Sequence, residues 1–179
     1  MIRERAECLI LVETYQSSLV LNIIKSGRVY RAHKNLRNDY AYRSLIDILH
    51  LHCECPIFGC LKYHKKNTNG RISNSVKMTL DVPKQFIHLT EYSIWADFMY
   101  SLHYTKPDHY KQIVIDNEEV TQRKMNHLIY SLKKQRRPWA YRVPQVILEE
   151  IRPEWLVKYQ TGSTQGPLEG LKRWFGWTG

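Results

Sequence analysis

The chain of 179 residues contains 43% hydrophobic and 12% aromatic residues, which is typical of a folded globular protein of one domain. Its 27 Lys and Arg residues exceed its 17 Asp and Glu residues and give a formal charge of +10. This excess favours a polyanionic partner, nucleic acid or a ribonucleoprotein, over an anionic membrane; a merely basic surface is the alternative. The chain has no apolar run of about 18 residues, which excludes a membrane-spanning helix. Its charged first residues lack a signal-peptide core, so we expect a cytoplasmic protein.

In the first half of the chain, the hydrophobic pattern predicts four strands and two helices. Continuous or alternating apolar residues indicate strands, whereas apolar residues three and four positions apart indicate helices. Gly27 is a signal for the end of a helix, and Asn69-Gly70 is a turn signal. The expected strands cover residues 8–13, 29–33, 57–63 and 76–82, and the expected helices cover residues 16–26 and 40–51.

The rest of the chain predicts two longer helices, two strands and a short closing element. We expect the helices at residues 90–104 and 118–135, strands at 85–89 and 145–151, and a short closing element at 153–157. These elements alternate with some neighbouring strand pairs, which predicts an α+β fold: a mixed twisted sheet with helices packed around it. The single domain is expected to cover residues 1–159, followed by a flexible linker and aromatic tail over residues 160–179.

Three of the four cysteines lie close to histidines between residues 50 and 64. Cys53, Cys55, Cys60 and His64 are weak candidate zinc ligands, because thiolates and imidazoles bind this ion. Only one residue separates Cys53 from Cys55, whereas zinc motifs place about two to four residues between thiols. An alternating strand would also direct Cys60 away from the other two thiols. We therefore expect no metal site and reduced, buried cysteines.

A basic and aromatic stretch within residues 123–142 is the main candidate for a binding surface. Cations at the end of a helix neutralise phosphates, and aromatic rings beyond it stack on unpaired bases. A solvated helix end followed by core aromatics fits the same pattern. The candidate residues of this stretch are Arg123, Lys124, Lys133, Lys134, Arg136, Arg137, Trp139, Tyr141 and Arg142. A second group near the Asn-Gly turn consists of Lys65, Lys66 and Arg71.

Several short motifs resemble the bacterial and phage family catalogued as domain of unknown function 3841 (DUF3841). Residues 13–16, Glu-Thr-Tyr-Gln, match the family's Trp-Thr-x-Gln in the threonine and the glutamine but carry glutamate for tryptophan. Residues 55–58 look like its Tyr-Pro-Ile-Trp strand, and residues 145–151 look like its closing strand. The likeness covers about residues 8–157, and the tail beyond has no counterpart in the family.

The order of elements also resembles, more distantly, the ADP-ribosyltransferase superfamily. Those folds end on a strand followed by x-Pro-Glu and two hydrophobic residues, and residues 146–157 have such an ending. The resemblance implies an enzyme using NAD, with Gln145 as the candidate catalytic residue where active members carry a glutamate. An amide has no charge for that task, although it can hydrogen-bond a ribose hydroxyl. The implied nucleotide pocket is lined by Thr14, Gln16, Tyr30, His33 and Tyr63. Without this activity, no cofactor is expected.

Three functions are therefore open from the sequence. The first is a basic binding protein of bacterial or phage type that engages nucleic acid or a nucleic-acid-bound complex, with host defence as one setting. The second is an ADP-ribosyltransferase-like enzyme that modifies a protein or nucleic-acid target. The third is a phage inhibitor that binds a host protein through the aromatic tail at Trp174, Phe175 and Trp177. The charge and the basic stretch favour the first.

Overall fold

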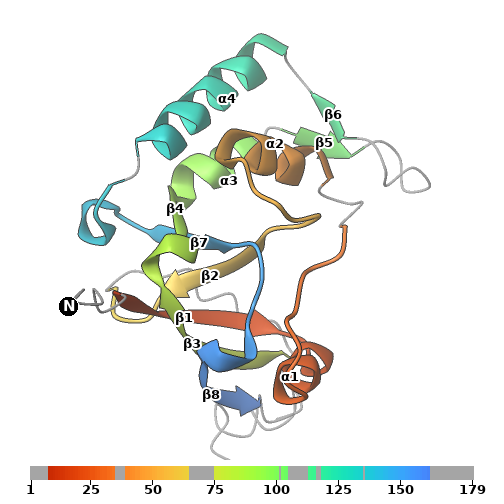
Figure 1. Cartoon of the computed structure of the whole chain (residues 1–179). Helices are drawn as coiled ribbons and strands as arrows, with labels where there is room; N and C mark the ends of the chain where they lie inside the picture. Colours follow the sequence, from red (N-terminus) through yellow and green to blue (C-terminus); the bar gives the residue numbers. More distant parts are fainter. Residues whose placement is uncertain are drawn as a thin grey trace, which may run out of the picture.

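The computed structural model describes residues 8–34, 39–64, 75–100, 102–104, 113–115, 118–134 and 136–161. Six strands form one twisted open sheet in the order β4-β7-β2-β1-β3-β8 (Figure 1). These strands are β1 (Leu9–Gln16), β2 (Ile57–Leu61), β3 (Val76–Pro83), β4 (His88–Glu91), β7 (Pro144–Leu148) and β8 (Leu156–Thr161). The helices are α1 (Ser18–Lys25), α2 (Asp39–Leu49), α3 (Tyr92–Tyr100) and α4 (Glu118–Lys133). A separate small sheet pairs β5 (Leu102–Tyr104) with β6 (Ile113–Ile115).

The structure confirms a single α+β domain with helices packed around a twisted sheet. It corrects the expectation of a mixed sheet, because every strand pair among the described residues is antiparallel. β1 lies inside the sheet and pairs with β3 along its whole length, from Leu9 opposite Pro83 to Gln16 opposite Val76. Within the described residues, no helix has the length and apolar character needed to cross a membrane.

Two hydrophobic cores lie on opposite faces of the sheet. Successive side chains of a strand point to opposite faces, and in β7 Val146 and Leu148 belong to one core while Ile147 belongs to the other. The first core joins these strands to α1, and the second joins Ile147 and Phe58 to α2, α3 and α4. Figure 1 shows α2, α3 and α4 gathered on the β4 side of the sheet, with α1 near β3 and β8. Trp95 of α3 anchors the second core, with its ring 5.9 Å from that of Phe58.

Two predicted elements differ from the observed ones because their residues pair with other segments of the chain. Residues 29–33 make two isolated bridges, Tyr30 with Ile151 and Ala32 with Cys55, and do not form the predicted strand. These two partners belong to separate segments, so no continuous ladder develops. The predicted helix over residues 90–104 begins later, because the last two residues of β4 pair with β7. It also ends earlier, since the chain enters β5 after α3.

The end of the domain contains a strand that the sequence did not predict. The expected closing element at residues 153–157 is a short 3-10 turn, η5 (Pro153–Trp155), followed directly by β8. β8 pairs with β3 and runs to Thr161, into the expected linker. The predicted strand at residues 85–89 is likewise part 3-10 turn, η2 (Lys84–Phe86), and part β4. The Asn69-Gly70 turn and residues 162–179 lie outside the described residues.

Candidate nucleic-acid interface

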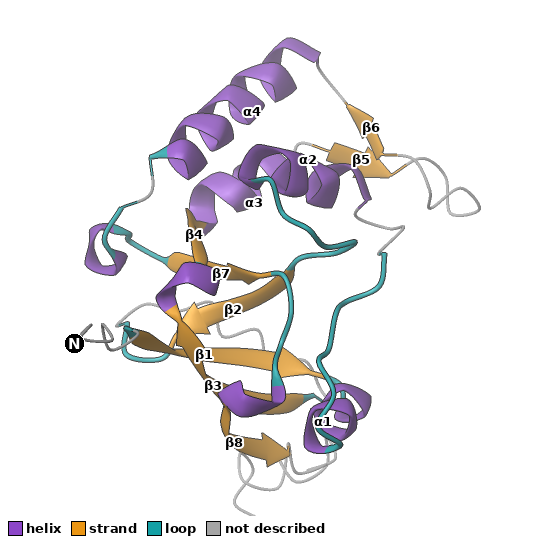
Figure 2. Ribbon diagram, viewed as in Figure 1, coloured by secondary structure: helices purple, strands orange, loops and turns teal. Residues whose placement is uncertain are grey.

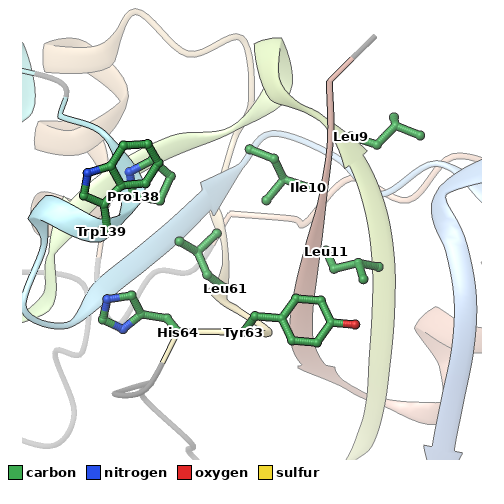
Figure 3. Close-up of a pocket in the computed structure, with 8 residues that line it drawn as sticks. All are labelled: Leu9, Ile10, Leu11, Leu61, Tyr63, His64, Pro138 and Trp139. Atoms are coloured by element: carbon green, nitrogen blue, oxygen red, sulfur yellow. The ribbon is translucent and has the colours of Figure 1, made fainter. Parts of the chain in front are cut away.

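A surface groove with a volume of about 400 Å³ lies where the start of β1, the end of β2 and the turn before β7 meet. Its apolar residues are Leu9, Ile10, Leu11, Leu61 and Pro138, and its ring-bearing residues are Tyr63, His64 and Trp139. Figure 3 shows Trp139 and Tyr63 on opposite sides of this group, with Leu61 between them in the view. We call this feature the aromatic groove.

Pairing of β1 with β2 forms one wall of the groove. β1 and β2 are antiparallel, with Val12 opposite Leu61, so the start of β1 lies beside the end of β2. The pairing continues for one more residue, because the Lys62 backbone N–H donates to the Leu11 carbonyl at 3.0 Å. The chain then turns, with the His64 N–H donating to the Leu61 carbonyl at 3.2 Å. Tyr63 sits on this turn, and 77% of its surface is exposed.

The other wall is the 3-10 turn η4 (Pro138–Ala140), which leads from α4 to β7 (Figure 2). Tyr141 anchors this turn: its side chain is buried, and its hydroxyl accepts from the Arg136 backbone N–H at 3.0 Å. The Ala140 N–H donates to the Arg137 carbonyl at 2.9 Å and closes the turn. Trp139 projects from it and keeps 72% of its surface exposed. The structure therefore corrects the prediction that Tyr141 stacks on bases, because its ring belongs to the core.

A cationic side chain lies beside each of the two exposed aromatic rings of the groove, Tyr63 and Trp139. The Lys62 ammonium lies 5.0 Å from the Tyr63 ring centre, and the Arg137 guanidinium lies 5.6 Å from the Trp139 ring centre. Such contacts hold a cation beside the ring without neutralising it. The residues that line the groove include no Asp or Glu. The aromatic groove thus combines an apolar floor with a positive rim.

A run of exposed cations leads to the groove from the end of α4. Lys133, Lys134, Arg136 and Arg137 are all exposed. The ion pairs of the described residues lie elsewhere in the chain, so no carboxylate described in the structure neutralises these four. The C-terminal end of a helix also attracts positive charge through its dipole. We call residues 133–137 the basic segment.

The other predicted cations divide between paired and unpaired groups. Lys124 forms an ion pair with Asp97 at 2.9 Å, which removes it from the set of available cations. Arg123 is exposed on the same helix, near the opposite end from the basic segment. Arg142 is exposed beyond η4, where its backbone N–H donates to the Glu91 carboxylate at 2.7 Å. Lys65, Lys66 and Arg71 lie outside the described residues.

The residues of the predicted nucleotide pocket do not all come together. Thr14 is buried; its hydroxyl donates to the Phe58 carbonyl and accepts from the Gln16 amide, each at 2.8 Å. This pair lies toward the end of β1 and the beginning of β2. Tyr63 follows Phe58 by five residues, or about 16 Å of extended chain, and so belongs to the opposite end of β2.

Tyr30 and His33 lie on the bridged segment outside the six-stranded sheet. The Tyr30 backbone exchanges two hydrogen bonds of 2.9 Å with Ile151. Burial raises the pKa of the Tyr30 hydroxyl, and the neighbouring Cys55 raises that pKa further. His33 is exposed. Of the residues of the predicted nucleotide pocket, only Tyr63 lines the aromatic groove.

Gln145 belongs to a row of buried polar residues that crosses the sheet. Strand pairing places it between Thr90 of β4 and Cys60 of β2, and Cys60 lies opposite Glu13 of β1. Residues paired in this way share one face of a sheet. The Gln145 Oε1 and Thr90 Oγ1 atoms are buried and have no hydrogen-bond partner in the described part of the chain. We call these four residues the polar row.

Glu13 in this row is buried and charged. Its carboxylate binds the Lys77 ammonium at 2.7 Å, across the pairing of β1 with β3. The hydrogen bond to Glu13 raises the pKa of Lys77 above its usual value, in spite of partial burial. The sequence showed this residue as part of a strand, but an isolated glutamate in an apolar run gives no sign of its partner.

Cys55 and Cys60 lie apart along the chain. Cys55 is in the bridge to Ala32, and Cys60 is in β2, about 16 Å further along an extended chain. Burial raises the pKa of Cys53 to about 11, and the nearby Glu149 and Cys55 also raise it. Among the described residues, no three His, Cys, Asp or Glu side chains are grouped so as to hold a metal ion.

Sequence reasoning assigned Tyr63 and Trp139 to different sites, and it did not include Leu9 to Leu11 at all. A usable signal was present, since each exposed ring has a cation close by in sequence: Lys62 before Tyr63 and Arg137 before Trp139.

No protein-family model, curated protein or solved structure matches the chain.

Proposed function

We propose that this protein binds nucleic acid through the basic segment and the surface around η4. The observation that carries the proposal is the run of four exposed cations, Lys133, Lys134, Arg136 and Arg137, with no carboxylate partner among the described residues. Other cations of the chain are already neutralised: Lys77 by Glu13 and Lys124 by Asp97. The proposal includes a cytoplasmic location, where nucleic acid is accessible.

The physical basis is counterion release. A cation that is free of a carboxylate replaces a condensed counterion when it contacts a phosphate, and the released ion increases the entropy of the solution. A cation in an ion pair first has to lose its partner, which cancels most of the gain. The clustering of unpaired cations within five consecutive residues therefore favours a polymer of phosphates over isolated acidic groups.

The test is a binding titration at several salt concentrations. Fluorescently labelled DNA and RNA oligonucleotides are titrated with the protein between about 50 and 200 mM salt, and binding is followed by anisotropy. We expect the logarithm of the association constant to fall linearly with the logarithm of salt concentration. Absence of binding at the lowest salt concentration, or binding that salt does not weaken, contradicts the proposal.

A second candidate function is the ADP-ribosyltransferase-like activity, and the polar row is the observation that favours it. Buried polar atoms nearly always have hydrogen-bond partners, and an exception calls for a bound group or a role in a site. Gln145 Oε1 and Thr90 Oγ1 are two such exceptions on adjacent strands. Incubation with labelled NAD and a cell extract tests this candidate. Transfer of label that is lost in Gln145→Ala supports it, and no transfer refutes it.

A further inference from the structure

We infer that the aromatic groove receives unpaired bases, so that the protein prefers single-stranded nucleic acid to duplex. This inference rests on the proposed function and adds a substrate class to it. The groove and the basic segment are adjacent, since Arg137 ends the segment and Pro138 begins the turn that carries Trp139. One bound strand is therefore able to contact both.

The first argument is the exposure of the two rings. Trp139 and Tyr63 expose 72% and 77% of their surfaces, whereas the other described tryptophans, Trp95 and Trp155, are buried. Large aromatic residues bury the most apolar area of any side chain, so leaving them in water forgoes a large stabilisation. Rings exposed in this way, on opposite sides of one groove, offer flat surfaces to a flat ligand (Figure 3). Every nucleic-acid base has such a face.

The second argument is that the backbone that carries the two rings is held in place by hydrogen bonds. Trp139 lies on a turn closed by a backbone hydrogen bond of 2.9 Å and anchored by buried Tyr141. Tyr63 follows the last paired residue of β2 and lies on a turn closed by a backbone hydrogen bond of 3.2 Å. Rings on fixed backbone lose little conformational freedom when a ligand binds, which makes stacking more favourable.

The third argument is the combination of charge and shape that selects the occupant. The floor of the groove is apolar, its volume of about 400 Å³ falls within the usual range for ligand pockets, and its lining contains no carboxylate. Lys62 and Arg137 add positive charge at both rings. An apolar peptide would match the floor but not the positive charge. A single strand of nucleic acid supplies bases for the apolar floor and the rings, and phosphates for the cations.

Duplex nucleic acid is able to contact the basic segment but not the two exposed rings. Its phosphates reach the basic segment, but its bases are stacked on one another and paired, so their faces are closed to protein rings. We therefore expect duplex binding to come from charge alone, and single-strand binding to come from charge plus stacking.

The experiment compares single strands with a duplex of the same sequence, using Trp139→Ala, Tyr63→Ala and a matched control. The control is Tyr159→Ala: this tyrosine of β8 is 43% exposed, and the Lys25 ammonium lies 5.0 Å from its ring, but it neither lines the groove nor contacts the basic segment in the described structure. DNA and RNA strands form separate arms, and stacking predicts binding in both. Circular dichroism of each variant confirms folding.

We expect the wild-type protein to bind the single strand more tightly than the duplex. Trp139→Ala should weaken single-strand binding about 5- to 150-fold, the range of one lost base stack, and leave duplex binding unchanged. Tyr63→Ala should act in the same direction, Trp139→Phe should recover most of the affinity, and Tyr159→Ala should have no effect.

Two results overturn the inference and leave the proposed function standing: equal affinity for single strand and duplex, or a Trp139→Ala variant that weakens both or neither. A variant that weakens neither would assign the groove to another occupant, such as an apolar protein segment, whereas one that weakens both would mean that Trp139 contacts duplex as well. Absence of salt-dependent binding to any oligonucleotide would instead overturn both.

Discussion

Removing the charge of the basic segment should weaken nucleic-acid binding and its dependence on salt together. The change is Lys133→Gln, Lys134→Gln and Arg136→Gln in one variant, which leaves Arg137 beside the Trp139 ring. The three side chains are exposed and have no ion-pair partner among the described residues, so their loss should not disturb the fold. The Arg136 contact with Tyr141 uses the backbone N–H and therefore survives.

The expected size of the effect follows from counterion release. For single strands, each phosphate contact contributes about 0.7 to the slope of log association constant against log salt, so three lost contacts reduce the slope by about 2. If the association constant at about 1 M salt is unchanged, the same relation lowers it roughly 100-fold at about 0.1 M salt. A loss of this size is far outside the error of an anisotropy titration.

The assay includes a control with the same change in net charge. Lys25→Gln, Arg28→Gln and Lys158→Gln also remove three exposed cations that have no ion pair in the described structure, but from α1, the residues just after it and β8. Figure 1 shows these elements at the end of the molecule opposite α4. The control should keep the wild-type slope. If it lowers the slope as much as the first variant, binding depends on net charge alone, and the assignment of the basic segment is refuted.

Four further predictions concern the fold, and urea denaturation measures each of them. Lys77→Ala leaves the buried Glu13 carboxylate unpaired and should lower the free energy of unfolding by about 3 kcal/mol. Lys124→Ala breaks a more exposed ion pair and should cost less than about 1 kcal/mol; equal losses would contradict the reasoning. Gly59→Ala would place a Cβ 2.9 Å from the Glu13 carbonyl oxygen and should lower the free energy of unfolding by about 1–3 kcal/mol. An unchanged free energy of unfolding would mean that β2 shifts at no cost. Burial lowers the pKa of His88 below 6.5, so the unfolded chain takes up the proton first as the pH falls. The free energy of unfolding should therefore decrease as the pH drops below 6.5. His88→Gln should remove this part of the decrease, and an unchanged decrease would refute the assignment to His88.

The sequence predicted best those elements whose apolar residues recur at the spacing of one buried face. Alternation over Val76, Met78, Leu80 and Val82 predicted β3, and the structure buries all four side chains. β8 was missed because it is an edge strand: residues 157–161 are exposed, so no apolar alternation marks it. Its position depends on pairing with β3, which is a long-range contact that local propensity does not contain.

The candidate site was predictable only in part, for a related reason. The sequence identified the cations of residues 133–137, because a basic run at the end of a helix is a local feature. It did not distinguish Trp139 from Tyr141, which lie two residues apart, because one 3-10 turn decides which ring is buried. Nor did it join Tyr63 to Trp139, since only the packing of η4 against the ends of β1 and β2 brings these walls together.

The most direct test of the central claim is to map where a bound strand touches the protein. A single-stranded oligothymidine is crosslinked to the wild-type protein by ultraviolet light, and mass spectrometry locates the adducts after digestion at acidic residues. We expect adducts on the peptides that contain Tyr63 and Trp139. Adducts confined to α1 and β8, or adducts absent from a mixture that anisotropy shows to be bound, would contradict it.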